Sequence, residues 1–280
     1  MTTVFMFPGQ GSQKEGMGED LFDTYADLTK NASEYLGYCL KTLCLTDHNK
    51  QLNQTQFTQP ALYVVNAFSW MKAVEEGQKA DMVLGHSLGE YNALLAAGVY
   101  DFMTGLKLVE KRGALMAKAK GGGMAAILGL TQDEVKNILQ EKHLETIDLA
   151  NINGTHQIVI SGPVTDIEAS VTVFQEASAK RVLPLAVSGA FHSRYMEEAQ
   201  VEFCTFLESF SYKVPQVSVI ANYTAEPYAD DSIVDNLKQQ LTHSVRWVQS
   251  MQYVLAQGDD VSCVELGPGK VLTGLLKRIR

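Results

Sequence analysis

The chain has 280 residues, of which 46% are hydrophobic and 20% are charged, proportions typical of a globular protein. A chain of this length can bury a large core, in one domain or in one domain with a smaller insert. Its formal net charge of -9 argues against a nucleic-acid surface and against an anionic membrane. No apolar stretch is long enough to span a bilayer. From the charge and the absence of such a stretch, we expect neither nucleic acid nor a membrane as a partner.

The cysteines and the first residues both predict a cytoplasmic protein. The four cysteines are Cys39, Cys44, Cys204 and Cys263. They lack metal-ligand spacing and are typical of thiols in a reducing compartment. The first three residues lead into a strand-like run without the basic region of a signal peptide. We therefore expect a cytoplasmic location and no metal site.

The first predicted element is a strand over residues 4–7, which ends in a glycine-rich loop. Gly9 and Gly11 let the backbone approach another group closely, and Gln10 projects between them. The loop matches neither the dinucleotide-binding fingerprint nor the phosphate-binding P-loop. An amide-lined site of the oxyanion type and a simple tight turn both fit it.

Helical spacing follows over residues 19–45, then a polar loop over residues 51–57. A second helix is predicted over residues 61–74, with Pro60 as an early-turn residue. Because this helix carries no charge over its first eleven residues, we expect it to be buried. Gln59, at its start, fits either a pocket or a capping position.

The segment over residues 79–100 carries the strongest functional signal. A short apolar run precedes Gly85-His86-Ser87-Leu88-Gly89, and a helix-forming segment follows. A strand, a sharp turn with serine at its apex and a helix are typical of a nucleophile elbow. The serine oxygen would then lie at the positive end of the helix, where N–H groups can hold an anion. A buried turn without chemistry is the alternative.

A further helix, over residues 102–118, carries Arg112 on a mostly apolar face. Arginines commonly lie on solvated faces. The alternative is a cation held inside a cleft, where its guanidinium forms a fork for a carboxylate.

Residues 121–123 are three glycines and predict a hinge, beyond which the pattern changes. The order strand, helix, two strands, helix, strand is that of the ferredoxin-like split arrangement. Thr131 and Glu134 resemble a capping box, and Pro184 favours an edge position for the last strand. We expect an inserted ferredoxin-like small subdomain at residues 124–188.

The rest of the chain, residues 1–123 and 189–280, is expected to form the large subdomain. Its later elements are helices over residues 195–209, 233–241, 245–256 and 271–279 and strands over residues 217–221 and 261–266. The sequence thus predicts an α/β fold, with an α/β-hydrolase-like large subdomain built on a mainly parallel sheet.

Serine is a weak nucleophile until a base takes its proton. His192 lies in the turn that returns from the insert, where a cleft between subdomains is expected, and is favoured over His243, which has a helical context. No aspartate occupies an obvious strand end ahead of His192. A dyad whose histidine is oriented by a backbone carbonyl therefore fits better than a triad.

Six segments then form a recognisable series in one order. They are Phe7-Pro8-Gly9-Gln10-Gly11-Ser12-Gln13, Thr58-Gln59-Pro60-Ala61-Leu62, Gly85-His86-Ser87-Leu88-Gly89-Glu90, Arg112-Gly113, Gly189-Ala190-Phe191-His192-Ser193 and Glu265-Leu266-Gly267-Pro268-Gly269. Together they resemble malonyl-CoA:acyl-carrier-protein transacylases, most of all the discrete acyltransferases that serve trans-acyltransferase polyketide synthases. The equivalent enzyme of fatty-acid synthesis is a close second.

The resemblance implies roles for particular residues. Ser87 would take the acyl group as an ester, with His192 as its base. The backbone N–H groups of Gln10 and Leu88 would form the oxyanion hole, and Arg112 would pair with the malonyl carboxylate.

A backbone carbonyl near a Val-x-Trp segment orients the histidine in this family. Here the segment is Val245-Arg246-Trp247, so the carbonyl of Arg246 is expected in that role.

Further residues are expected around the substrate. Gln59, Met116, Asn153 and Phe191 would line the pocket, and the bulk of Phe191 would leave little room for an α-methyl group. The basic pair Lys180-Arg181 would meet the phosphates of coenzyme A or of the carrier's phosphopantetheine.

Malonyl-CoA is expected as substrate and an acyl carrier protein as partner, with no bound cofactor. A proofreading acyl hydrolase with the same serine and histidine, and a catalytically idle docking module, are the alternatives.

Overall fold

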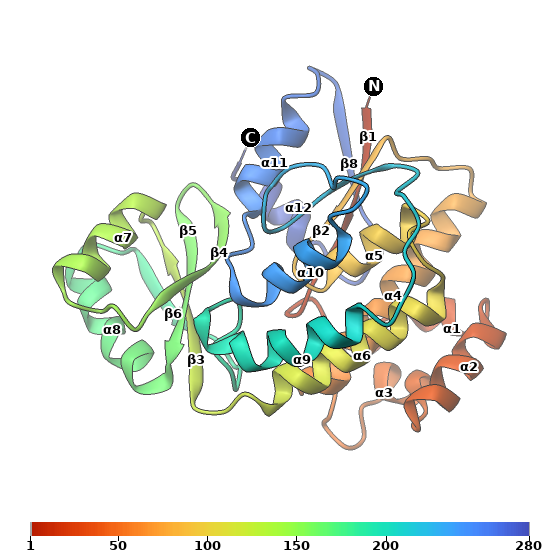
Figure 1. The fold of residues 1–280 in the computed structure, drawn as a ribbon, viewed down its shortest axis with the longest axis horizontal. Helices are drawn as coiled ribbons and strands as arrows, with labels where there is room; N and C mark the ends of the chain where they lie inside the picture. The colour runs from red at the N-terminus through yellow and green to blue at the C-terminus, as the bar shows by residue number, and fades with distance from the viewer. Residues whose placement is uncertain (1, 280) are drawn as a thin grey trace.

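Strand β1 (Thr2–Phe7) is an inner strand of a four-stranded sheet in the computed structural model, which describes residues 2–279 (Figure 1). The sheet has the order β7-β2-β1-β8 and every pair in it is parallel. Its other strands are β2 (Met82–Gly85), β7 (Ser218–Ile220) and β8 (Val261–Glu265).

Side chains of β1 alternate between two apolar cores, one on each face of this sheet. Phe5 and Phe7 belong to the larger core, whereas Val4 and Met6 belong to a smaller one on the other face. A parallel sheet needs cover on both faces, and the alternating apolar residues supply the contacts for it.

Helices α4 (Thr55–Glu75), α5 (Gly89–Ala96) and α6 (Phe102–Lys118) cover the face with the larger core. Helices α11 (Trp247–Leu255) and α12 (Val271–Leu276) contribute to the smaller core. The remaining helices of this part are α1 (Glu19–Phe22), α2 (Ala26–Leu36), α3 (Leu40–Leu45), the 3₁₀ helix η1 (Arg194–Met196), α9 (Glu197–Leu207) and α10 (Ile233–Thr242).

The second sheet is antiparallel and lies to the left of the first in Figure 1. In chain order its unit contains β3 (Gly122–Leu128), α7 (Gln132–Glu141), β4 (Asp148–Gly154), β5 (Gln157–Pro163), α8 (Val164–Glu176) and β6 (Arg181–Pro184). The strand order β4-β5-β3-β6 is that of a ferredoxin-like unit. The predicted α/β fold with a ferredoxin-like insert is thus confirmed, while the domain boundaries at 123/124 and 188/189 stay predictions.

The two faces of the small sheet have different surroundings. Ala125 and Ile127 pack with α7 and α8 in a core of their own. Met124 and Ala126 point the other way and join the larger core. The small sheet therefore presents one face to the large subdomain, and residues of that face can line a site between the two.

Local signals in the insert are also confirmed. Thr131 and Glu134 form both halves of the capping box at the start of α7. Pro184 ends β6, which is an edge strand, so its missing N–H leaves no central ladder position unpaired.

Several predicted boundaries differ from the structure. Helix α4 begins at Thr55, inside the predicted loop over residues 51–57, and Pro60 lies within it. The helical region over residues 19–45 is divided into three helices, the second of which ends at Gly37 with φ 77°. The helix predicted from residue 245 begins at Trp247, because Val245 instead forms a β-bridge with Asn151 of β4.

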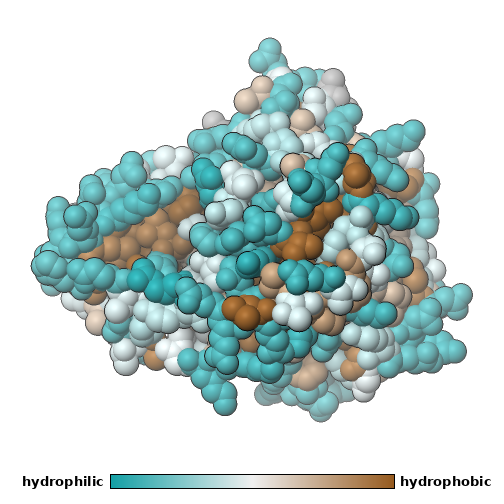
Figure 2. Space-filling view, in the orientation of Figure 1, coloured by the Kyte–Doolittle hydropathy of each residue, from teal (hydrophilic) through white to brown (hydrophobic). Residues whose placement is uncertain are grey.

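None of the helices in residues 2–279 combines the length and the apolar character needed to cross a bilayer. On the face drawn in Figure 2, hydrophilic residues predominate, and apolar residues gather in smaller areas over the small subdomain and near α10.

Candidate active site

Ser87 lies on the turn between β2 and α5, with φ 52°. Two glycines allow this turn. A Cβ on Gly85 would lie 1.9 Å from the carbonyl carbon of Gly89, and a Cβ on Gly89 would lie 2.0 Å from the carbonyl oxygen of Phe7. Strand, helix and β1 therefore meet more closely than any side chain permits, which is the geometry of a nucleophile elbow.

His192 faces this serine across the site. Its Nε2 lies 2.7 Å from Ser87 Oγ, and its Nδ1 lies 2.7 Å from the carbonyl oxygen of Gln240. Because a carbonyl oxygen only accepts, Nδ1 carries the hydrogen and Nε2 is free to accept the serine proton. His243 lies apart, bonded to the carbonyl of Gln239, and is exposed.

The prediction that Arg246 orients the histidine is wrong. The carbonyl of Arg246 accepts from the N–H and the hydroxyl of Ser250, at 2.9 and 3.0 Å, because Arg246 begins helix α11. Val245 is tied to β4 through Ala150 and Ile152, which fixes this segment beside the small sheet. The last turn of α10 supplies the carbonyl instead.

Arg112 is a buried cation of the site, only 1% exposed, and not a solvated-face arginine. Its Nη2 donates to Ser87 Oγ and to Gln240 Oε1, both at 3.0 Å, and its Nη1 donates to Gln59 Oε1 at 2.8 Å. Its guanidinium carbon lies 5.5 Å from the ring centre of Tyr91. These contacts hold the fork of the guanidinium beside the nucleophile.

The charge of Arg112 acts on the histidine. Burial and the nearby guanidinium together lower the pKa of His192 to about 3. Burial removes the solvation that an imidazolium needs, and a like charge disfavours it further. The imidazole is therefore neutral near pH 7 and available as a proton acceptor.

Ser87 and His192 share one cavity with most of the predicted site residues. Its lining includes Gln10, Gln59, Leu88, Met116 and Phe191. The structure thus brings the first glycine-rich loop and the turn at His192, which are far apart in the sequence, to the same cavity.

Asn153 lines a second, adjoining cleft rather than the cavity at Ser87. Its Oδ1 lies 2.7 Å from Nε2 of His86, which lines both spaces. Burial lowers the pKa of His86, so its ring is neutral and links the elbow to the small subdomain.

The basic pair Lys180-Arg181 lines neither space. Arg181 begins β6 opposite Leu128, at the far end of the small sheet from the cavity-lining Met124. Arg278 lies closer to the cleft, since its Nη1 donates to Oε1 of the cleft residue Gln157 at 2.6 Å.

Three residues that support the site were not predicted from the sequence: Glu90, Asn222 and Gln240. Asn222, two residues after the end of β7, accepts from the N–H of Ser87 at 2.7 Å and donates to the carbonyl of Gly85 at 2.6 Å, so it holds both sides of the elbow turn. The sequence held one signal for each of two of them. Asn222 is a polar residue that follows the predicted strand over residues 217–221, and Glu90 is a charged residue in a mostly apolar helix.

Glu90 is completely buried. Burial raises its pKa to about 7, while hydrogen bonds from Tyr228, Asn222 and Gln240 and the charge of Arg112 oppose the shift. The carboxylate form accepts all three of these bonds.

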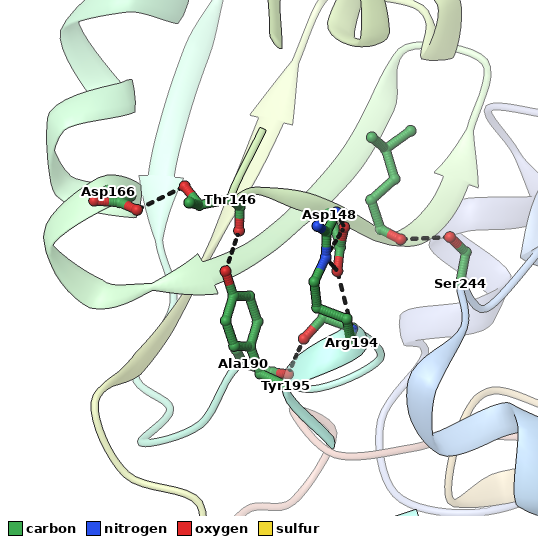
Figure 3. A network of polar contacts seen from close by, with 9 residues as sticks. Thr146, Asp148, Asp166, Ala190, Arg194, Tyr195 and Ser244 are labelled. Carbon is green, nitrogen blue, oxygen red and sulfur yellow. Dashed lines mark hydrogen bonds and ion pairs between the residues drawn. The ribbon is translucent and has the colours of Figure 1, made fainter. Parts of the chain in front are cut away.

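The turn that carries His192 is also tied to the small subdomain (Figure 3). The N–H and the guanidinium of Arg194 both bond the carboxylate of Asp148 on β4, and Tyr195 donates to the carbonyl of Thr146 at 2.9 Å. Within the turn, Ser193 donates to the carbonyl of Ala190 at 2.5 Å. The position of the imidazole thus depends on contacts with both subdomains.

Residues 2–279 contain no cluster of three histidine, cysteine or carboxylate side chains arranged to hold a metal ion. The site is built from a serine, a histidine and an arginine.

Comparison with known proteins agrees with this arrangement. The model of the acyl transferase domain family matches residues 4–278. The chain is 53% identical over 279 residues to the polyketide biosynthesis malonyl CoA-acyl carrier protein transacylase BaeC of Bacillus velezensis, covering 99% of this chain and 96% of BaeC. It resembles the crystal structure of a malonyl CoA-acyl carrier protein transacylase from Burkholderia pseudomallei, with a TM-score of 0.97 and 46% identity over 100% of this chain and 98% of that one.

A second solved structure is a malonyl-transacylase in complex with a type II PKS acyl carrier protein. It has a TM-score of 0.94 and 36% identity, covering 100% of this chain and 93% of that one. With a family model matched almost end to end and a relative above half identity, this chain belongs to the acyl transferase domain family.

Proposed function

We propose that this enzyme moves a malonyl group from malonyl-CoA, through an ester on Ser87, to the phosphopantetheine thiol of an acyl carrier protein in polyketide biosynthesis. One observation carries the proposal. The oxygen of Ser87 lies 2.7 Å from a neutral imidazole nitrogen and 3.0 Å from a buried guanidinium. A nucleophile, its base and a partner for a carboxylate thus meet at one atom. The names of the relatives supply the malonyl group and the carrier.

In the first half-reaction His192 takes the proton of Ser87 as its oxygen attacks the thioester carbon. The carbonyl oxygen becomes an oxyanion, which we assign to the N–H groups of Gln10 and Leu88. One such donor can be worth about 3 kcal/mol in the transition state. The carbon–sulfur bond then breaks, and the coenzyme A thiolate leaves with the proton that His192 returns.

In the second half-reaction the carrier's thiol gives its proton to His192 and attacks the malonyl ester. The ester bond to Ser87 breaks and the serine oxygen recovers the proton. The two half-reactions form a ping-pong cycle that consumes no cofactor.

Arg112 gives the preference for an acyl group that ends in a carboxylate. Burying a guanidinium without a negatively charged partner costs free energy, and the Nε of Arg112 has no hydrogen-bond partner among the residues that the structure describes. A malonyl carboxylate supplies that partner, whereas a neutral acyl group does not. The carboxylate also offsets the charge that lowers the pKa of His192, so binding of the correct acyl group strengthens the base.

The adjoining cleft between the subdomains is our choice for the phosphopantetheine arm. It is lined by Gln10 and His86 on one side and by Asn153 and Gln157 on the other. Arg278, bonded to Gln157, and the pair Lys180-Arg181 would face an acidic carrier. On the cysteine pattern given above, we also propose a cytoplasmic location.

A transfer assay tests the function. The enzyme is incubated with labelled malonyl-CoA and a phosphopantetheinylated acyl carrier protein, with Ser87→Ala as control. We expect label on the carrier with the unchanged enzyme and none with S87A. Label recovered only as free malonate would instead identify a hydrolase, and transfer by S87A would exclude the ester route.

A further inference from the structure

Glu90 is a buried carboxylate that touches none of the reacting atoms, although it lies three residues after Ser87 in the first turn of α5. Its Oε1 accepts from the N–H of Asn222 at 2.9 Å and from the hydroxyl of Tyr228 at 2.7 Å. Its Oε2 accepts from Nε2 of Gln240.

Gln240 connects this carboxylate to the reacting groups through both its backbone and its side chain. Its main-chain carbonyl accepts from His192. Its side-chain oxygen accepts from Arg112 at 3.0 Å, and its side-chain nitrogen donates to the carbonyl of Ser87 at 2.9 Å as well as to Glu90.

Only one orientation of the Gln240 amide satisfies these neighbours. A carboxylate and a carbonyl accept, whereas a guanidinium only donates. If the amide turned over, its NH₂ would face the Arg112 guanidinium and its oxygen would face two acceptors, Glu90 and the carbonyl of Ser87. Glu90 thereby sets which end of the amide meets Arg112.

We propose that Glu90 is a positioning residue, which holds the Gln240 amide and through it keeps the Arg112 fork beside Ser87 ready for an acyl carboxylate. The inference rests on the proposed malonyl transfer. In residues 2–279 no direct ion pair joins Glu90 to Arg112, so the hydrogen-bonded path between them runs through Gln240, beside the longer-range attraction of their charges.

The variant Glu90→Gln separates this role from simple burial of a polar group. Its amide matches the shape of the carboxylate but contains one donor and one acceptor. In one orientation the new amide oxygen faces Asn222 and Tyr228, and the new NH₂ then faces the NH₂ of Gln240, so two donors meet. In the reversed orientation the new NH₂ faces the N–H of Asn222, and again two donors meet. Either arrangement disturbs the chain of contacts to Arg112.

The readout is the rate of acylation of Ser87 by malonyl-CoA and by acetyl-CoA, which requires no carrier protein. We expect E90Q to lower the malonyl rate about 10- to 100-fold and the acetyl rate much less, because only malonyl uses the guanidinium.

Two controls keep the result interpretable. Tyr228→Phe removes another hydrogen bond of Glu90 without touching Gln240, so it should lower the melting temperature and leave the malonyl-to-acetyl ratio unchanged. Gln240→Met removes the amide and keeps the main-chain carbonyl, so it should reduce the ratio even if E90Q fails to fold.

Equal losses for both acyl donors in E90Q and Q240M, or an unchanged ratio in Q240M, would overturn the positioning role. The unchanged enzyme reports separately on the proposed function, since failure of malonyl-CoA to acylate it would reject malonyl transfer itself.

Discussion

The Nη2 of Arg112 lies 3.0 Å from Oγ of Ser87. An acyl group that is esterified to Ser87 therefore lies next to a positive charge that is held in place. Gln59 and Gln240 each accept from the same guanidinium and keep it from turning away. Nucleophile and specificity group are therefore a single unit, and changes to the arginine should alter the choice of acyl group more than the chemistry.

Replacing Arg112 tests this directly. In Arg112→Ala the malonyl carboxylate loses a charge-assisted partner worth about 2–3 kcal/mol, which corresponds to a loss of about 30- to 150-fold in kcat/KM for malonyl-CoA. Acetyl-CoA has no carboxylate, so its rate should hold or rise. Steady-state rates with both donors measure the ratio.

Lys118→Ala is the matched control, because Lys118 is an exposed cation on the same helix. Rates that fell alike for both donors in R112A would show that the arginine only supports the fold.

Stability should depend on pH through His192. Its folded-state pKa is about 3, below the ordinary 6.5, so the unfolded chain binds the extra proton between these values. The contribution of His192 to stability is then present above pH 6.5 and is lost as the pH falls toward 3, by up to about 1.4 kcal/mol per pH unit.

Denaturant unfolding of the unchanged protein and of His192→Asn between pH 7 and pH 4 gives this difference. The stability of the unchanged protein should fall relative to H192N as the solution is acidified. A constant difference would mean that the histidine titrates normally in the folded state.

The contact between Asp148 and Arg194 should matter more for rate than for stability. Arg194 is largely exposed and Asp148 is partly buried, so breaking the ion pair and the bond from the N–H of Arg194 in Asp148→Ala should cost about 1–2 kcal/mol. The turn with His192 loses its tie to β4, however, and we expect kcat to fall several-fold. Asp23→Ala, which breaks the surface pair with Lys41, is the control. Parallel losses of rate and stability in D148A would contradict this view.

Gly89 should not tolerate a side chain. A Cβ there would meet the backbone oxygen of Phe7 at 2.0 Å, so Gly89→Ala must displace β1 or the elbow at a cost of about 1–3 kcal/mol or more. Thermal unfolding measures the loss. Gly274 in α12 has open space around its Cβ position, and Gly274→Ala should stabilise the protein by about 0.5–1 kcal/mol. Similar melting temperatures for both variants would argue against the close approach at the elbow.

Much of this arrangement was predictable because it depends on local constraints. Gly85 and Gly89 on either side of Ser87 are needed because strand and helix approach too closely there for a side chain, so they predict the elbow. The order of strands and helices after residue 121 is compatible with few folds. Likewise, Pro184 could not occupy a central strand.

Other parts were not predictable because they depend on how distant elements pack. The carbonyl that orients His192 belongs to a residue 48 positions away, and nothing in the sequence distinguishes it from that of Arg246. The buried bonds of Glu90 join α5 to segments more than 130 positions away. The placement of Lys180-Arg181 away from the cavity follows from the strand register, which the sequence pattern does not give.

The central claim is that Ser87 carries the acyl group. Brief exposure of the protein to malonyl-CoA, followed by proteolysis and mass spectrometry, maps the added mass. We expect one malonyl group on the peptide that contains Ser87, and none on that peptide in Ser87→Ala. A malonyl group on a different residue, or no covalent product in an enzyme that still transfers malonyl, would contradict the account.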